Sequence, residues 1–322
     1  MLIDGKWSGK WHPFQSKDAK GRFVRQDSQF RNWITPDGAP GPSGQGGFQA
    51  EPGRYHIYAS LNCPWASRTL LVRKLKNLEN IITLTVVAPF TTDEGWQFGG
   101  FPGCAEDEVN GAAHLHEVYT TADPRYTGRA TVPVLWDKRR GTIVNNESSE
   151  IIRMLNRAFA GLGDDGLDLY PDGLAGDIDD LNAKVYEKLN NGVYRAGFAA
   201  TQEAYDEAVA AVFAMLDELE QRLSDGRRLL MGEQPTEADV RLFVTLVRFD
   251  AAYHGLFKCN LRRLADYPNL TAYVERMMGL PGASDTVAVE HIKAGYYSIR
   301  ALNPSGIIPA GPAEIFEPPT SA

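Results

Sequence analysis

The chain has few cysteines, no long apolar run and no excess of basic charge. Its 322 residues include only Cys63, Cys104 and Cys259, too few and too scattered for a disulfide framework. No apolar run approaches the roughly 18 residues of a membrane helix, and no apolar signal segment opens the chain. The net charge is −8, whereas a nucleic-acid partner would require a basic face. We therefore expect a cytoplasmic protein without membrane or nucleic-acid partners.

Cys63 is the most informative residue because of its place in the secondary-structure pattern. A predicted strand over 54–59 precedes it, and apolar residues at helical spacing follow it over 64–77. Pro64 suits the first helical turn, where its missing N–H costs nothing. The sulfur would then face the free N–H groups of a helix start, which can lower a thiol pKa from near 8.5 to roughly 3.5–7.5. This predicts a nucleophilic thiolate.

A second cysteine is missing at the position that a dithiol motif would use. In Cys-x-x-Cys the second thiol resolves a mixed disulfide, but Ala66 stands there. A disulfide on Cys63 must therefore be resolved by an external thiol, which predicts monothiol chemistry of the glutathione type. Cys104 and Cys259 lack a comparable setting, and we interpret both as structural.

The pattern divides the chain into an α/β half and a helical half, flanked by irregular ends. The first half reads β-α-β-loop-β-β-α, and its βαβ unit implies a parallel strand pair. The predicted strands are 54–59, 81–87, 131–137 and 142–144, the helices are 64–77 and one from about 147, and the long irregular loop is 88–128. The predicted regions are an irregular arm at 1–50, the α/β domain at 51–165, a helical domain at 166–300 and an irregular tail at 301–322.

Helix signals in the second half include an N-terminal capping motif. Val212, Leu216 and Leu219 mark one face of an amphipathic helix. A further helix opens at Thr236, and Asp239 three residues later can reach back to the backbone as in a capping box.

This layout resembles that of glutathione transferases. Val132-Pro133 opens a strand where thioredoxin-like folds keep a cis-proline beside the thiol. Glu147-Ser148 opens a helix where such folds hold the γ-glutamyl end of glutathione. The resemblance implies a thioredoxin-like domain with a mixed four-stranded sheet, followed by an all-helical domain.

A narrower set of motifs resembles the glutathionyl-hydroquinone reductases, which form the xi class of glutathione transferases. The motifs are Cys63-Pro64-Trp65-Ala66, the long insertion, Asn190–Tyr194, Gly295–Ser298 and Asn303–Pro309. The likeness extends from Trp33 to Pro312, although Ser67 stands where many relatives carry histidine.

The resemblance implies a reaction and assigns residues to it. Cys63 would attack the glutathione sulfur of a glutathionyl-hydroquinone, and a second glutathione would resolve the mixed disulfide. Tyr194 and Tyr296 would contact the hydroquinone as catalytic residues, and Tyr253 and Tyr297 would line its pocket. The residues implied for glutathione are Trp96, Arg129, Val132, Pro133, Glu147 and Ser148. The resemblance also implies a homodimer.

Simpler interpretations remain open at this stage. The proline could belong to an ordinary edge strand, Glu147-Ser148 could only cap a helix, and the tyrosines could be core residues. His114 and His116 have a spacing that suits a metal, but no further Cys or His follows at metal-site spacing. We therefore expect these histidines to be solvent-exposed and expect no metal. Two other functions remain: an omega-like thioltransferase or dehydroascorbate reductase, and a non-catalytic ligand-binding module.

Overall fold

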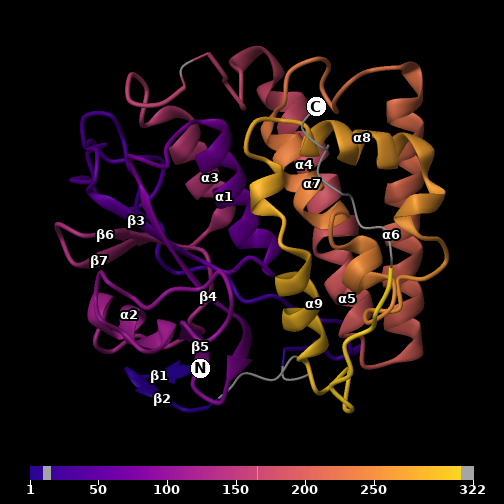
Figure 1. Cartoon of the computed structure of the whole chain (residues 1–322), viewed down its shortest axis with the longest axis horizontal. Coiled ribbons are helices and arrows are strands. Elements are labelled where there is room, and N and C mark those ends of the chain that lie inside the picture. The colour runs from indigo at the N-terminus through magenta and orange to yellow at the C-terminus, as the bar shows by residue number, and fades with distance from the viewer. Residues whose placement is uncertain (10–15, 165, 313–322) are drawn as a thin grey trace. The chain divides into compact units, whose positions relative to one another are not determined.

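The computed structural model describes residues 1–9, 16–164 and 166–312, and the chain separates into two compact units (Figure 1). Unit 1 comprises 1–11 and 27–168, and unit 2 comprises 12–26 and 169–322. The expected arm at 1–50 is therefore not one region, because its middle part belongs to the helical unit. The described part of the expected tail, 301–312, has turns at 301–302 and 304–305 and no helix or strand, and the remainder, 313–322, lies outside the described residues.

Unit 1 is built on a mixed sheet in which β3 is central. Its strands are β3 (Tyr55–Ala59), β4 (Thr83–Thr92), β5 (Gly95–Phe98), β6 (Val134–Asp137) and β7 (Thr142–Asn145). The order is β5-β4-β3-β6-β7, with β3 parallel to β4 and antiparallel to β6. Helices α1 (Pro64–Leu75) and α3 (Ser148–Arg157) lie side by side in this unit (Figure 1). The predicted elements outside the loop, β-α-β before it and β-β-α after it, are confirmed in this order.

The prediction of a four-stranded sheet was wrong, because the sheet has five strands among the described residues. Strand β4 continues through Thr92, and β5 folds back against it across a tight turn. Gly95 takes φ +83° at this turn, a backbone conformation that is unfavourable for residues with a side chain. The segment 88–128, expected to be an irregular loop, thus supplies part of the sheet, as well as helix α2 (Leu115–Ala122).

The rest of this insertion is tied to the sheet by a polar contact. The Tyr58 hydroxyl of β3 donates to Asp107 Oδ1 at 2.8 Å, and Asn110 Nδ2 donates to the same hydroxyl at 2.8 Å. Asp107 also accepts hydrogen bonds from the backbone N–H groups of Val109 and Ala112. The insertion is therefore an ordered part of unit 1.

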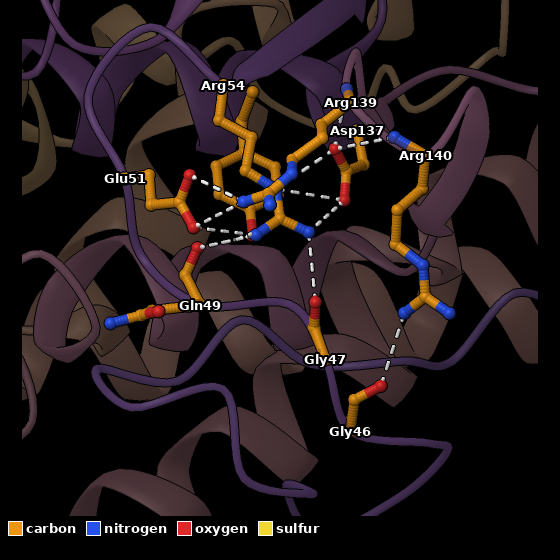
Figure 2. Close-up of polar contacts among 9 residues, drawn as sticks. Gly46, Gly47, Gln49, Glu51, Arg54, Asp137, Arg139 and Arg140 are labelled. Carbon is orange, nitrogen blue, oxygen red and sulfur yellow. Dashed lines mark hydrogen bonds and ion pairs between the residues drawn. The ribbon is translucent and has the colours of Figure 1, made fainter.

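Arg54 joins the N-terminal arm to the sheet (Figure 2). Its guanidinium bonds Asp137 at the end of β6 with Nε 3.0 Å from Oδ1, and both residues are buried. The same guanidinium donates to the Gly47 carbonyl at 2.9 Å and to Glu51 Oε1 at 3.1 Å. A short ribbon of β1 (Leu2–Ile3) and β2 (Lys6–Trp7) begins the arm.

Unit 2 is helical, as expected, and its buried capping box is confirmed. Asp239 Oδ2 accepts from the Thr236 N–H at 2.8 Å, while Oδ1 accepts from the Leu230 N–H at 2.9 Å. The α-helices are α4 (Ala175–Val185), α5 (Gly192–Gly197), α6 (Gln202–Arg222), α7 (Glu237–Leu246), α8 (Pro268–Met278) and α9 (Val289–Tyr297). The π segments are Tyr186–Asn190 and Phe249–Tyr253, and the 3-10 turns are Asp172–Leu174, Leu223–Asp225, Leu264–Asp266 and Ser284–Thr286. Over the described residues, none of these helices has both the length and the apolar character needed to cross a bilayer.

Removing the Asp137 carboxylate should strongly destabilise unit 1. In Asp137→Ala the buried Arg54 loses its paired charge, which typically costs about 3–5 kcal/mol. Arg139→Ala is the control, because Arg139 is exposed and exposed ion pairs contribute about 0–1 kcal/mol. Urea unfolding measures both free energies. Equal, small losses in the two variants would show that the Arg54–Asp137 pair does not stabilise the unit.

Candidate active site

Cys63 lies at the start of α1, as predicted. It is the N-cap residue, with extended backbone angles of φ −83° and ψ 118°, and Pro64 is the first helical residue. The Cys63 N–H donates to the Ser60 carbonyl at 3.1 Å, and the Cys63 carbonyl accepts from the Ser67 N–H at 2.9 Å. The turn after β3 therefore holds the half-buried thiol at the N-terminus of α1. The first backbone N–H groups of a helix have no hydrogen-bond partner within that helix.

The Val132–Pro133 peptide bond lies beside this thiol and is cis, so the predicted isomer is confirmed. The Cys63 sulfur is 3.8 Å from the Val132 carbonyl oxygen, within range of an S–H donor. Strand pairing explains the proximity, because Tyr58 of β3 is opposite Val134 of β6. In an antiparallel pair, the residues after one strand lie beside those before the other.

Glu147 and Ser148 open α3 as predicted. The Glu147 carboxylate is the N-cap and accepts from the Ser149 N–H at 3.2 Å. It also accepts from the Ser28 hydroxyl at 3.1 Å. Capping is therefore one established role of Glu147, and a helix start of this kind also favours an anionic ligand.

Arg68 is a residue of this region that the sequence analysis missed. Its side chain is buried, and Nη1 lies 3.4 Å from the Ser148 hydroxyl, which links α1 to the start of α3. Its guanidinium also lies 4.5 Å from the centroid of the Trp65 ring. The sequence signal that could have identified it is an arginine next to the apolar residues of the predicted helix that follows Cys63.

A buried tyrosine connects the cis-proline segment with the start of α3. The Tyr119 hydroxyl of α2 donates to the Thr131 carbonyl at 2.8 Å and accepts from Asn146 Nδ2 at 3.0 Å. Thr131 precedes Val132, and Asn146 precedes Glu147. The insertion thus contributes through α2 to positioning two predicted glutathione contacts.

Trp96 and Arg129, two further residues implied for glutathione, both belong to unit 1. Trp96 is a half-buried residue of β5 paired with Thr91 of β4. Arg129 is half-buried in the segment that leads to the cis-proline, and its carbonyl accepts from the Tyr126 hydroxyl at 3.2 Å. Their glutathione contacts stay predictions.

Unit 2 brings three of the predicted tyrosines together. The hydroxyls of Tyr194 and Tyr296 are 2.6 Å apart, and those of Tyr296 and Tyr253 are 2.9 Å apart. Tyr194 lies on α5, Tyr253 ends the π segment, and Tyr296 lies on α9. Their hydroxyl groups form one hydrogen-bonded cluster. Tyr297, the fourth predicted tyrosine, is also buried, and its carbonyl accepts from Asn303 Nδ2 at 2.7 Å.

Burial keeps the hydroxyls of Tyr253 and Tyr296 protonated. It raises the pKa of Tyr253 and Tyr296 well above the ordinary value for tyrosine, because a phenolate would lose its hydration there. Tyr194 is the less buried member of the cluster. Protonated hydroxyls can donate to an oxygen atom of a ligand, as neutral hydrogen-bond donors do in oxyanion-binding sites.

Arg25 is the second residue that the sequence analysis missed. It comes from the part of the N-terminal arm that belongs to unit 2, and its guanidinium lies 4.9 Å from the centroid of the Tyr194 ring. Arg25 Nε also donates to Asn191 Oδ1 at 3.0 Å. The sequence separation of 166 residues left no local signal for this contact.

The other two cysteines have the structural character expected of them. Burial raises the pKa of Cys104 to about 11 and that of Cys259 to about 12. Both therefore remain protonated thiols at neutral pH. Their poor reactivity leaves Cys63 as the candidate nucleophile of the chain.

Comparison with known proteins identifies the family. The models of the glutathione S-transferase N-terminal and C-terminal domains match residues 62–158 and 202–276. Glutathionyl-hydroquinone reductase YqjG of Escherichia coli (strain K12) is 52% identical over 321 residues, which are 99% of this chain and 97% of that protein. The chain belongs to the glutathionyl-hydroquinone reductase family of glutathione transferases.

Further members of the family agree in sequence and in fold. Glutathionyl-hydroquinone reductase PcpF of Sphingobium chlorophenolicum is 51% identical, over 98% of this chain and 96% of that protein. The glutathione-bound structure of YqjG matches with a TM-score of 0.89 at 50% identity, covering 97% and 96% of the two chains. The glutathione-S-transferase Xi of Phanerochaete chrysosporium matches with a TM-score of 0.88 at 50% identity, covering 94% and 96%. The predicted family and class are thereby confirmed.

The difference among the three thiols gives a test that is independent of any substrate. Iodoacetamide at about pH 7.5 should modify Cys63 much faster than Cys104 or Cys259, whose raised pKa values disfavour the reactive thiolate. Modification of Cys104 should accelerate only as the pH rises towards about 11. Peptide mass spectrometry measures each rate, with Cys63→Ala as the control. Equal rates at the three cysteines near neutral pH would contradict this account of their environments.

Proposed function

We propose that the protein is an enzyme that reduces S-glutathionyl-hydroquinones to hydroquinones, with glutathione as the co-substrate. The observation that carries the proposal is Cys63 at the N-cap of α1, beside the Val132 carbonyl, with Ala66 where a resolving cysteine would stand. The two relatives of 52% and 51% identity bear the name of this activity, which supports the assignment.

In the first step, the Cys63 thiolate attacks the sulfur of the aryl thioether. A disulfide forms between Cys63 and glutathione, and the bond between sulfur and the ring carbon breaks. The ring carbon keeps the electron pair of that bond and takes up one proton, which completes the hydroquinone. An acid group near the ring facilitates this step because the carbon leaves as a carbanion equivalent.

In the second step, the thiolate of another glutathione molecule attacks the Cys63 mixed disulfide. Oxidised glutathione leaves and the Cys63 thiolate is regenerated. The two electrons that reduce the substrate therefore come from two glutathionyl sulfurs, one of them already attached to the ring. A reducing compartment such as the cytoplasm supplies the free glutathione.

We assign the glutathionyl part of the substrate to unit 1. The Val132 backbone, next to Pro133, would pair with a peptide-like ligand, and the start of α3 at Glu147 and Ser148 would hold the charged groups of the γ-glutamyl end. Trp96 and Arg129 complete the proposed set. The Trp96 ring would pack against glutathione, and the Arg129 guanidinium would pair with one of its carboxylates. Arg68, through the Ser148 hydroxyl, would position this set rather than touch the ligand.

We assign the aromatic part of the substrate to the tyrosines of unit 2. Tyr194 and Tyr296 would donate hydrogen bonds to a ring oxygen and so favour the keto tautomer, in which the C–S bond is easier to break. Tyr253 would orient Tyr296 through the hydrogen bond between their hydroxyls, and Tyr297 would contribute to the pocket wall.

We also propose that the protein is a homodimer, which light scattering coupled to size-exclusion chromatography would test.

Replacing Cys63 should abolish turnover of a glutathionyl-hydroquinone such as the glutathione conjugate of menadiol. Wild type with excess glutathione should release hydroquinone and oxidised glutathione, whereas Cys63→Ala should do neither. Cys104→Ala is the matched control and should retain activity, because its thiol is protonated and unreactive. Chromatography of the products measures all three proteins.

Other outcomes of the same assay would overturn the proposal. Full activity in Cys63→Ala would exclude the thiolate mechanism. No turnover by the wild type, but reduction of a glutathione mixed disulfide or dehydroascorbate, would identify an omega-like thioltransferase instead. Inactivity on all of these substrates would favour a non-catalytic binding module.

Removing one tyrosine hydroxyl should slow the reaction without unfolding the protein. Tyr296→Phe and Tyr194→Phe should each lower kcat/KM by about 10- to 100-fold, since a hydrogen bond to a developing charge contributes about 1.5–3 kcal/mol. Tyr186→Phe is the control, because Tyr186 is exposed on the same unit. Steady-state kinetics would contradict the assigned role if all three variants matched the wild type.

A further inference from the structure

The insertion holds a cluster of histidine and glutamate side chains that the proposed reaction does not use. His114 is the N-cap residue of α2 but makes no side-chain capping hydrogen bond, and His116 and Glu117 lie in the first turn. The expectation that these histidines are solvent-exposed was wrong, because their side chains are only 22% and 12% exposed. Glu94, in the turn between β4 and β5, faces the cluster from another element.

The potential ligand atoms of this cluster converge. One atom each from His114, His116 and Glu117 lies within 4.8 Å of the other two. His114 Nδ1 is 3.5 Å from Glu117 Oε1, and His116 Nε2 is 3.3 Å from Glu94 Oε2. Two imidazoles and two carboxylates therefore meet around a small volume within unit 1.

The surrounding contacts hold the histidine rings in place. Trp7 of the β1–β2 ribbon stacks on His116 with centroids 4.6 Å apart, and the His114 ring is 5.6 Å from that of His116 on centroids. Trp7 is itself fixed, because its Nε1 donates to the Asp93 carbonyl at 2.9 Å. A Cβ at Gly95 would lie 2.9 Å from the Trp7 ring, so a larger residue there would displace the ring.

The environment of His116 suits a metal ligand better than a solvated base. Its Nε2 is sealed from solvent and has no well-oriented hydrogen bond, although a Glu94 oxygen lies close by. A neutral imidazole carries a lone pair on one ring nitrogen. A divalent cation would use that lone pair and balance the carboxylates at the same time.

We propose that His114, His116 and Glu117 form a zinc-binding site, with Glu94 or a water molecule as the fourth ligand. Two imidazoles and a carboxylate are a donor set that Zn²⁺ accepts in tetrahedral geometry. Ligands at about 2.0–2.2 Å from a tetrahedral ion lie about 3.3–3.6 Å apart, so the side chains must draw together by about 1 Å on binding. The two imidazole planes are within 8° of parallel, so the His114 ring must also turn to point at a shared ion.

Zinc at this position would connect three parts of unit 1. The ligands come from the start of α2 and the β4–β5 turn, and Trp7 carries the connection to the N-terminal ribbon. The ion would thus stabilise the insertion, which also supplies Tyr119 to the segment beside the cis-proline. This inference is independent of the proposed reaction.

Cobalt and zinc titrations of Cys63→Ala protein test the site. The Cys63→Ala background removes the most reactive thiol, which would otherwise compete for soft metal ions. Co²⁺ should produce the intense visible absorption of a tetrahedral complex at one ion per chain, and Zn²⁺ should abolish it by displacement. Zn²⁺ should also raise the Tm of this protein, because it binds the folded state.

Variants separate the proposed site from other metal-binding groups. His116→Gln and Glu117→Gln, each in the same background, should weaken zinc binding by about 10- to 100-fold or more, as loss of metal-site contacts does. His254→Gln is the histidine control in unit 2, and Glu108→Gln is the exposed carboxylate control within the insertion. Both controls should bind zinc like the parent, and circular dichroism would verify that each variant is folded.

Three results would overturn the zinc site. They are the absence of one-to-one binding in the parent, an octahedral cobalt spectrum, and unchanged affinity in both His116→Gln and Glu117→Gln. The last result would place any bound zinc elsewhere on the protein. Because Glu117 is less buried than His116, its variant keeps the test decisive if His116→Gln does not fold.

Discussion

The antiparallel pairing of β3 with β6 is the constraint on which the candidate active site depends. Register places Tyr58 opposite Val134, so the chain leaving β3 and the chain entering β6 run beside each other. The first of these segments ends at Cys63 and the second contains the cis-proline. The thiol and the Val132 carbonyl are thereby brought to 3.8 Å by backbone hydrogen bonds of the central strands, before any ligand is considered.

The insertion, residues 88–128, packs as an integral part of unit 1. Its polar anchor to β3 is the Tyr58–Asp107 bond, and its helix α2 supplies Tyr119 to the Thr131 carbonyl. A change in the insertion can therefore reach, through hydrogen bonds, the backbone that we propose to bind glutathione. Three of the proposed zinc ligands, His114, His116 and Glu117, lie at the start of this helix, so zinc binding and activity should be measured separately.

Local sequence signals predicted the parts of the site that depend on neighbouring residues. Cys63, Pro64 and Ala66 were sufficient for the N-cap position and for the absence of a resolving thiol. Strand β5 was missed because the turn at Asp93 and Glu94 lies inside the segment expected to be a loop, and only pairing with β4 makes Gly95–Phe98 a strand. Local pattern could not distinguish an irregular insertion from a short hairpin with weak periodicity.

Contacts between distant residues could not be read from the sequence. Arg54 and Asp137 are 83 residues apart, and Arg68 and Ser148 are 80 apart. Tyr194 and Tyr296, 102 residues apart, were identified through family resemblance and not from spacing. Each pair depends on how helices and strands pack, which a local window does not contain.

The most direct test of the central claim is a single turnover without free glutathione. One equivalent of a glutathionyl-hydroquinone is mixed with wild-type protein, and the products are analysed by intact-protein and peptide mass spectrometry. The account predicts one glutathionyl group in disulfide linkage on Cys63 and one equivalent of released hydroquinone. Release of hydroquinone without an adduct, or attachment of the aromatic ring itself to Cys63, would contradict attack of the thiolate on the glutathione sulfur.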